Sequence, residues 1–362
     1  KQKADAGPVH RAAQKMNVAL DNILFISPYI SEIRAVQRIG AVTAWMRSGQ
    51  GAGPKSSAGD FEIENIAGVK DIVRMGIPLP PGKLPNRLLH EFLNQFVFDD
   101  PSVLINPGVG EDIAAVDIKS DEILVLKADP ITFATDSIGQ YAVLVNANDI
   151  ATSGATPRWL LTTLFFPGGT TPSQIKHVFE ELKSFCRQWG ITLCGGHTEI
   201  TDAVNRPIVA GMMTGTVARR DLIDKRRLEK GDRVLLTKGV AVEGTAIIAR
   251  EFGARLKKLG MTAAEIHRCR KFLDNISIIT EAKIAAATAG TSAMHDVTEG
   301  GLATALEELS AAGDHSIRVD TDNIPLFPET RKICDLLDIN PLGLIGSGSL
   351  LICCTSKDCK KL

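Results

Sequence analysis

The sequence lacks an excess of charge of either sign, since its 41 Lys and Arg residues face 42 Asp and Glu residues, for a formal net charge of -1. Such a balance gives no electrostatic reason to expect nucleic acid or an anionic membrane as a partner. The chain also lacks an apolar run of the roughly 18 residues that a membrane span needs. Its first residues, "KQKADAGPVH", have no apolar core of a signal peptide. We therefore predict a cytoplasmic protein with no nucleic-acid partner and no membrane partner.

Cysteine is sparse and does not occur in the spacing of a metal or redox motif. The seven cysteines are odd in number and include no Cys-x-x-Cys pair, which argues against a disulfide framework and against a zinc site. Three further patterns are missing: the P-loop G-x-x-x-x-G-K-[ST], the dinucleotide fingerprint G-x-G-x-x-G and the nucleophile elbow G-x-S-x-G. The nucleotide-binding folds and hydrolases that use these motifs are not indicated.

At 362 residues, the chain is long enough for two or three domains. Residues 1–78 read as helix, strand, helix, strand, a partial Rossmann-like segment, and the Pro/Gly-rich residues 79–85 read as a linker. Residues 86–225 alternate strands and helices in the α+β order of a sheet covered on one face. Residues 226–362 are rich in predicted helix and end in an apolar strand.

The hydrophobic periodicity predicts individual elements along the chain. We expect strands at 23–26, 41–46, 113–118, 122–129, 159–166, 207–217 and 347–354. We expect helices at 9–18, 31–40, 142–154, 173–190, 242–253, 264–273, 277–290 and 301–313.

Acidic residues gather in four places at the ends of predicted elements. A carboxylate in such a place is usually only a helix cap. Four together are harder to explain as caps, because Mg²⁺ takes one or two carboxylates plus phosphate oxygens, and scattered loop-borne acids can supply them. The four groups are Glu111 with Asp112, Asp129, Asp149 with Asn146 and Asn148, and Asp296 with Glu299.

Glycines stand beside some of these acids, in "GVGED" and in "LCGGHTE". Glycine lets the backbone approach a ligand and point its N–H groups at phosphate oxygens. Two histidines, His197 and His295, lie in these motifs. A lone histidine is more often a packed or surface residue than a ligand, and we assign neither of them as a general base.

Several motifs follow one another in an order that resembles the aminoimidazole ribonucleotide synthetase-related (PurM-like) superfamily, nearest to hydrogenase maturation proteins of the HypE type. The resemblance covers about residues 83–362 and implies an N-terminal dimerising α+β domain, a C-terminal α/β domain, and ATP with Mg²⁺ held in the cleft between them. It also implies a homodimer. The motifs are "GVGEDIAAVDI", "KADPITFATDSIGQYAVLVNANDIATSGATPRW", "LCGGHTEIT", "GDRVLLTKGVAVEGTAIIA" and "HDVTEGGLATAL".

The resemblance also implies an activity and site residues. Members of this superfamily use ATP to phosphorylate an acceptor, which implies here an ATP- and Mg²⁺-dependent phosphotransferase whose acceptor is a small molecule or borne by a protein. A HypE-like member would activate an amide-type oxygen for a metalloenzyme maturation partner. The implied Mg²⁺ ligands are Asp112, Asp149 and Asp296. The implied nucleotide contacts are Asp129, Asn146, Gly195, Gly196 and His197.

Two alternatives stay open beside this activity. One is a nucleotide-binding scaffold that assists metalloenzyme assembly without turnover, and the other is a small-molecule kinase resembling thiamine-monophosphate kinase. Selenophosphate synthetase carries a reactive cysteine or selenocysteine before its Gly-Asp-Asp motif, and this chain has no cysteine before Cys186. HypE proteins use a cysteine on a C-terminal tail, whereas Cys359 lies just after a predicted strand, so we expect the C-terminal domain to be cut short at Leu362.

Residues 3–73 show a second, weaker resemblance, to the C-terminal half of haloacid dehalogenase-like phosphatases. In those proteins a strand ends in Gly-Asp and a second Asp follows. Here the same place reads "ISPYISE", with Pro28 at the first acidic position and Glu32 at the second. We therefore expect this segment to be catalytically dead and to serve in docking or structure.

Overall fold

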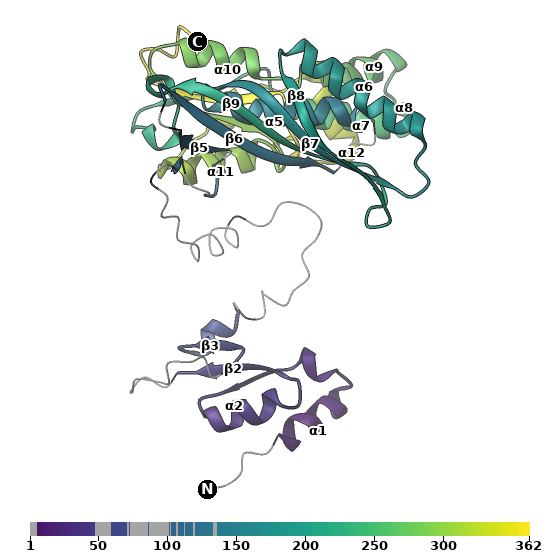
Figure 1. The fold of residues 1–362 in the computed structure, drawn as a ribbon, viewed down its shortest axis with the longest axis vertical. Coiled ribbons are helices and arrows are strands. Elements are labelled where there is room, and N and C mark those ends of the chain that lie inside the picture. The colour runs from purple at the N-terminus through teal and green to yellow at the C-terminus, as the bar shows by residue number, and fades with distance from the viewer. Residues whose placement is uncertain are drawn as a thin grey trace. The chain divides into compact units, whose positions relative to one another are not determined.

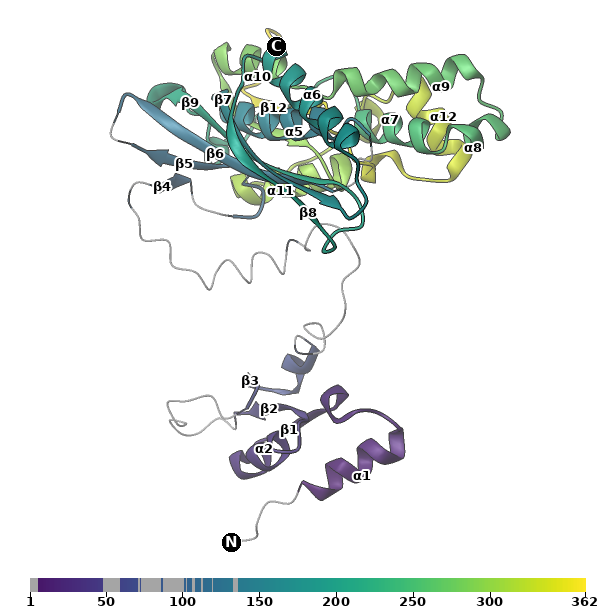
Figure 2. The same cartoon turned by 45° about the vertical axis from the view of Figure 1, so that its right-hand side comes forward.

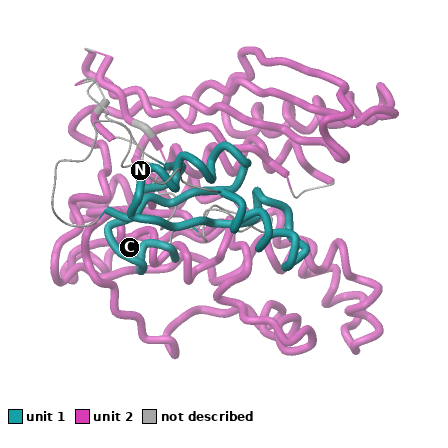
Figure 3. The backbone as a smooth tube through the Cα atoms, turned by 90° about the horizontal axis from the view of Figure 1, so that it is seen from below, with its two compact units in different colours: residues 1–81 teal, residues 82–362 magenta. Residues whose placement is uncertain are grey.

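The computed structural model contains two compact units, residues 1–81 and residues 82–362, which Figure 3 draws in different colours. None of the helices it describes has the length and apolar character that a bilayer crossing requires. The predicted linker lies outside the described residues, and the predicted domain limits stay predictions. The structure describes residues 6–47, 59–70, 72, 86, 101, 103–105, 108–111, 113–118, 120–132 and 136–362.

The first unit contains a three-stranded parallel sheet of order β1-β2-β3 (Figure 1). The predicted order of helix, strand, helix and strand is confirmed, and a third strand follows it. Ile33 and Val36 of α2 are buried, so this helix packs through its apolar side. Whether the unit is a partial Rossmann-like segment stays a prediction. Its elements are α1 (Gly7–Met16), β1 (Leu24–Ser27), α2 (Ile30–Gln37), β2 (Val42–Met46) and β3 (Phe61–Ile63).

The second unit is built on a six-stranded sheet of order β4-β5-β6-β9-β7-β8. All neighbouring strands are antiparallel except β7 and β8, which are parallel. The parallel pair is joined by helix α6, the crossover that such a pair needs. The strands are β4 (Val103–Ile105), β5 (Ala114–Asp117), β6 (Glu122–Ile131), β7 (Thr156–Pro167), β8 (Thr192–Thr201) and β9 (Ile208–Ala218).

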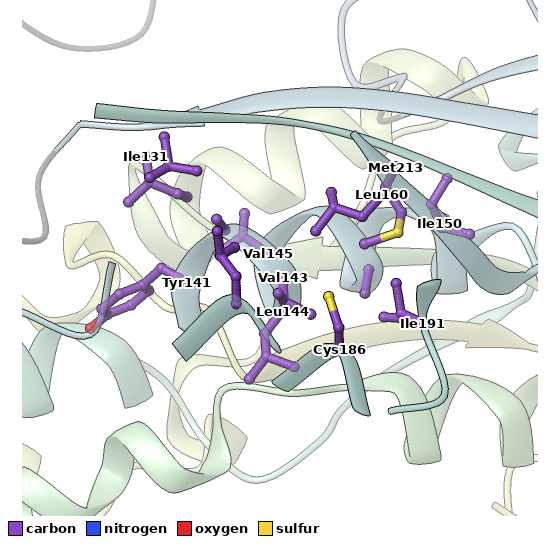
Figure 4. Close-up of a cluster of buried hydrophobic side chains, with 14 of the residues drawn as sticks. Ile131, Tyr141, Val143, Leu144, Val145, Ile150, Leu160, Cys186, Ile191 and Met213 are labelled. Carbon is purple, nitrogen blue, oxygen red and sulfur yellow. The ribbon is translucent and has the colours of Figure 1, made fainter. Parts of the chain in front are cut away.

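Helix α5 (Ile138–Thr152) packs on this sheet, and α6 (Pro172–Gln188) packs on α5. All 15 residues of α5 are buried, including the polar residues Gln140, Asn146, Asn148 and Asp149. Figure 4 shows Tyr141, Val143, Leu144, Val145 and Ile150 of α5 packed among Ile131, Leu160, Met213, Cys186 and Ile191. This cluster is the main core of the unit.

Two glycines of β9 let α5 lie close to the sheet. Gly211 and Gly215 are four residues apart and therefore share one face of the strand. A Cβ added at Gly211 would lie 2.6 Å from Nδ2 of Asn146, and one added at Gly215 would lie 2.5 Å from Cγ2 of Ile150. Any larger side chain at these two positions would push α5 away.

A second, antiparallel sheet of order β10-β12-β11 lies in the C-terminal half, where helices surround it (Figure 2). Helix α11 packs on one side of this sheet through Leu302 and Leu309, and α10 packs on the other side through Ala282. The strands are β10 (Arg233–Leu236), β11 (Thr291–Val297) and β12 (Ser349–Cys354). The helices are α7 (Val242–Glu251), α8 (Gly253–Lys258), α9 (Ala263–Arg270), α10 (Ile279–Ala287), α11 (Gly301–Gly313) and α12 (Pro328–Leu337).

Polar side chains of α5 form hydrogen bonds between the part of the second unit that contains the large sheet and its C-terminal half. Nε2 of Gln140 donates a hydrogen bond to the carbonyl of Leu273. Asn148 donates from Nδ2 to the carbonyl of Ile276 and accepts at Oδ1 from the N–H of Ile278, at 2.8 and 2.9 Å. A fully buried helix can keep these amides because each has a partner, and α5 is thereby fixed against the C-terminal half.

Candidate functional site

One row of residues in register crosses four strands of the large sheet. From β6 through β9 and β7 to β8, its members are Asp129, Gly211, Thr162 and Gly196. Neighbouring strands are about 4.8 Å apart, so the row is about 14 Å long. Because a Cβ added at Gly211 would touch Asn146 of α5, this row lies on the α5 face of the sheet. Two predicted nucleotide contacts, Asp129 and Gly196, therefore share one face.

Asn146 lies over this row and is fully buried. Its Nδ2 donates hydrogen bonds to the carbonyl of Ala142, at 2.9 Å, and to the carbonyl of Asp129, at 3.3 Å. Its Oδ1 has no hydrogen-bond partner among the described residues. Asn146 thus bonds α5 to β6, and its second polar atom, Oδ1, is a buried acceptor without a partner among the described residues.

The predicted magnesium ligand Asp149 lies one helical turn further along α5. Its carboxylate is buried, and Oδ2 lies 3.0 Å from Nζ of Lys127 on β6. The same ammonium group lies 3.7 Å from Oδ2 of Asp129. Lys127 therefore links two predicted site residues and compensates a carboxylate that would be costly to bury alone.

Asp296 is presented by β11, where adjacent side chains point to opposite sides of the sheet. Met294, on the same side as Asp296, is buried in one cluster with Ala151 of α5. Asp296 is 2% exposed. Because it shares a side of β11 with Met294, it faces α5, the helix that carries Asp149. Strand β11 ends at Val297 and helix α11 begins at Gly301, so the turn "TEG" lies between them.

His295 points to the other side of β11, into a buried network. Its Nδ1 lies 3.2 Å from Nζ of Lys225 and its Nε2 lies 3.2 Å from a carboxylate oxygen of Glu308. Lys225 also donates to the carbonyl of Gly110, at 2.6 Å. His295 is therefore a packed histidine in a network that fixes the motif "GVGED". Asp112 of this motif lies outside the described residues.

The described residues contain no group of three or more His, Cys, Asp or Glu side chains placed to hold a metal ion. Asp149 and Asp296 come from elements that face each other, and Asp112 is not among the residues described. Magnesium binding by these three residues stays a prediction.

The glycine-rich motif after α6 forms strand β8. Gly196 has a φ of 152°, and a Cβ added there would lie 2.0 Å from the carbonyl oxygen of Thr162. The next residue, His197, points to the opposite face, with a side chain 66% exposed and 3.6 Å from Glu199. His197 and Asp129 thus lie on different faces of the sheet, and the predicted contact of His197 with a nucleotide stays a prediction.

A pocket of about 140 Å³ lies where β6, α5, α7 and the loop after β11 meet. It contains the predicted residue Asp129 and also Glu299 from the motif "HDVTEGG". The pocket joins the large sheet to the C-terminal half, as a cleft between two domains would. Its lining is Asp129, Pro130, Ile131, Tyr141, Val145, Glu243, Ile247, Thr298, Glu299, Ile345 and Ser347.

Glu243 of α7 is a pocket residue that we did not predict. It is 5% exposed and accepts hydrogen bonds from the hydroxyl and the backbone N–H of Ser347. The pKa of Glu243 is raised to about 7, mainly by burial and to a smaller extent by the negative charge of Glu299, while the hydrogen bonds from Ser347 oppose both effects. Glu243 can therefore gain or lose a proton near neutral pH.

Family models match two parts of this chain. One is described as the N-terminal domain of AIR synthase related proteins and matches residues 110–217. The other is described as the C-terminal domain of the same proteins and matches residues 229–362. Neither match includes residues 3–73, so the resemblance of that segment to haloacid dehalogenase-like phosphatases has no support from them.

Two relatives illustrate the similarity. Carbamoyl dehydratase HypE of Cupriavidus necator is 27% identical over 264 residues, which are 70% of this chain and 71% of the relative. Selenide, water dikinase of Shewanella sp. (strain MR-7) is 32% identical over 263 residues, which are 70% of this chain and 68% of the relative. Both matches extend over most of the second unit.

Solved structures share the fold of the second unit. HypE from E. coli superposes with a TM-score of 0.59 at 21% identity, over 76% of this chain and 84% of that chain. A HypE structure in complex with ATP gives 0.54 at 21% identity, over 78% and 81%. A complex of HypE with HypF gives 0.60 at 18% identity, over 75% and 85%. The two-domain α/β fold is common to all of them.

Proposed function

This chain belongs to the AIR synthase-related family, and from that premise we propose that it is an ATP- and Mg²⁺-dependent enzyme that transfers a phosphoryl group to a small-molecule or protein-borne acceptor. Phosphoryl transfer asks a protein for positioning and charge neutralisation more than for covalent chemistry. Carboxylates serve this need through the Mg²⁺ that they bind.

The observation that carries the proposal is the placement of Asp149 and Asp296. Both are 2% exposed, and they lie on α5 and β11, which pack against each other. Buried carboxylates need compensating positive charge or donors, and Lys127 already supplies part of it for Asp149. We propose that they hold Mg²⁺ together with Asp112, since Mg²⁺ usually takes one or two carboxylates and completes its shell with phosphate oxygens and water. The ion would neutralise charge on the transferred group.

The nucleotide would lie along the α5 face of the large sheet. Asp129 and Gly196 belong to the row on this face, and the buried Asn146 holds the backbone of Asp129 through its Nδ2. The contact of Asn146 itself with the nucleotide stays a prediction. Gly195 and Gly196 have no side chains, so their backbones can approach phosphate oxygens closely. His197 would contact the nucleotide only around the edge of β8, because its side chain leaves the sheet on the other face.

A HypE-like acceptor, with an amide-type oxygen and a metalloenzyme maturation partner, fits this chain better than selenide. The relative named selenide, water dikinase is 32% identical, but the resemblance to selenophosphate synthetase calls for a cysteine before "GVGED". The first cysteine here is Cys186, which is buried on α6. Burial raises its pKa to about 11, so this thiol is a poor nucleophile at neutral pH.

We also propose that the chain forms a homodimer through the outer face of the large sheet. Leu161 and Met212 are in register on that face, opposite α5, and each is 42% exposed. Apolar side chains side by side on an open sheet face mark a surface that gains stability when it is covered. A second copy of the chain would cover it.

ATP turnover separates this proposal from a scaffold that only binds nucleotide. Purified protein would be incubated with ATP, with and without Mg²⁺, and with amide-bearing acceptors or thiamine monophosphate. We expect Mg²⁺-dependent release of ADP that increases with the correct acceptor. Binding of ATP without any release of ADP would favour the scaffold, and phosphorylation of thiamine monophosphate would favour the small-molecule kinase.

A further inference from the structure

Glu243 is placed in the pocket by an unusual stretch of backbone. Lys238 and Ala241, in the segment between β10 and α7, have φ values of 57° and 59°. Non-glycine residues in this region cost of order 1 kcal/mol each and persist where the surrounding structure requires them. On the other side, a Cβ added at Gly244 would lie 2.9 Å from the carbonyl oxygen of Ile345. The start of α7 is therefore fixed against its neighbours.

One carboxylate oxygen of Glu243 is engaged and the other is open. Ser347 donates two hydrogen bonds to the carboxylate, whereas Oε2 is buried and has no partner in the part of the chain that the structure describes. An unpartnered buried acceptor costs free energy unless a ligand satisfies it. Oε2 is thus a site for an O–H or N–H donor that enters the pocket.

The charged and titratable groups around Glu243 come from every element packed against it. Asp129 faces it from β6, Glu299 from the loop after β11, and Tyr141 from α5. Burial, and then the charge of Glu243, raise the pKa of Tyr141, so its hydroxyl keeps its proton, while Arg250 of α7 opposes that shift. Among the described residues that line the pocket, none is a lysine or arginine.

A pocket lined by carboxylates is more favourable for the phosphoryl acceptor than for the phosphates of ATP. Carboxylates without a basic side chain repel the phosphates of a nucleotide unless a cation lies between them, whereas they accept a hydrogen bond from a neutral donor directly. Within the proposed function, the pocket therefore suits the group that receives the phosphoryl, at its reacting O–H or N–H.

Resting on the proposed function, we propose that Glu243 is the general base that activates the phosphoryl acceptor. Oε2 takes the proton of the acceptor's O–H or N–H while that oxygen or nitrogen forms a bond to the γ-phosphorus. The bond from that phosphorus to the bridging oxygen of ADP breaks, and ADP leaves with the electron pair. Glu243 then gives the proton to solvent and is ready for another cycle.

The test uses water as the acceptor and Mg²⁺ with ATP as substrate, so it needs no identified acceptor. The rate of ATP hydrolysis would be measured from about pH 5.5 to pH 9. Wild type should lose activity on the acid side with an apparent pKa near 7, because only the ionised base accepts a proton. Glu243→Gln should be slower by roughly 10²–10⁴-fold and should lose this pH dependence, while binding AMPPCP as wild type does.

A second variant checks the assignment without removing the base. Glu299→Gln removes a negative charge that raises the pKa of Glu243, so it should move the acid limb to lower pH. The exposed Glu180 of α6 provides a matched control, and Glu180→Gln should leave the whole profile unchanged. Normal binding of AMPPCP by each variant shows that it is folded.

The outcomes separate the two levels of the proposal. If Glu243→Gln hydrolyses ATP at the wild-type rate, with the same acid limb, Glu243 is not the base and the phosphotransferase proposal stands. An unmoved limb in Glu299→Gln would likewise assign the titration to another group. A wild-type protein that binds AMPPCP and never releases ADP from ATP, with water or with any of the acceptors named above, would overturn both proposals together.

Discussion

At the scale of single residues, the protonation of Glu243 changes the free energy of unfolding with pH. The pKa of this carboxyl is about 7 in the folded protein and ordinarily 4.5. The folded state therefore holds the proton more tightly than the unfolded state between these two values. The stability that Glu243 contributes is fully present below about pH 4.5 and is lost as the pH rises through 7.

Glu243→Gln should therefore be more stable than wild type at high pH. The difference in the free energy of unfolding should grow between about pH 4.5 and 7 and level off on the order of 3 kcal/mol. Denaturant unfolding of both proteins at pH 5 and pH 8 measures it, with Glu180→Gln as the control. A difference that is equal at the two pH values would mean that the pKa of Glu243 is not raised.

Some site residues could be found from sequence and others could not. Acidic residues near glycines in ordered motifs pointed to Asp129, Asp149 and Asp296, and the structure buries the last two on facing elements. Lys127 was only weakly indicated: it lies two residues before Asp129 on the same strand, and residues two apart on a strand share a face. Glu243 could not be found, because its hydrogen-bond donor Ser347 lies 104 residues further along the chain.

At the scale of elements, α5 determines how the two halves of the second unit meet. Asn148 satisfies one carbonyl and one N–H of the segment that leads into α10. Water cannot replace these bonds if Asn148 is lost, since α5 is buried at every position.

Asn148→Ala should destabilise the protein by about 2–4 kcal/mol, because it leaves a buried carbonyl and a buried N–H without partners and opens a cavity. Urea unfolding measures the loss. The exposed Asn205 is the control, and Asn205→Ala should change the free energy of unfolding by less than about 0.5 kcal/mol. Equal effects of the two substitutions would show that α5 is not held in this way.

Helices and strands with a clear hydrophobic periodicity could be predicted from sequence, whereas strands that form only because they pair with a neighbouring strand could not. The expected helices at 142–154, 173–190 and 301–313 correspond to α5, α6 and α11. Strand β8 was read only as a glycine-rich motif, because glycine is disfavoured within strands and the exposed polar residues around it show no alternation. Residues 192–201 form a strand because they pair with β7, not because of a pattern in their own sequence. Strand β3, only three residues long, could not be recognised from its own sequence either.

At the scale of the whole molecule, the outer face of the large sheet predicts assembly. Leu161→Lys would place a charge where the proposed dimer is apolar, so the dimer should dissociate while the fold persists. Light scattering at micromolar concentration would report the mass, and circular dichroism would report the fold. Ile284 of α10 is also exposed, at 56%, and Ile284→Lys should leave the mass unchanged. A wild type that is only monomeric would contradict the dimer.

The most direct test of the proposed activity compares Asp296→Asn with wild type in ATP turnover and melting temperature. Asn keeps the size of the side chain and removes one negative charge from the proposed magnesium site. We predict that Mg²⁺-dependent release of ADP falls on the order of tenfold to a thousandfold, with little change in melting temperature. The exposed Asp202 is the control, and Asp202→Asn should behave as wild type. Turnover by Asp296→Asn equal to that of wild type would contradict the assignment of this carboxylate to the reaction.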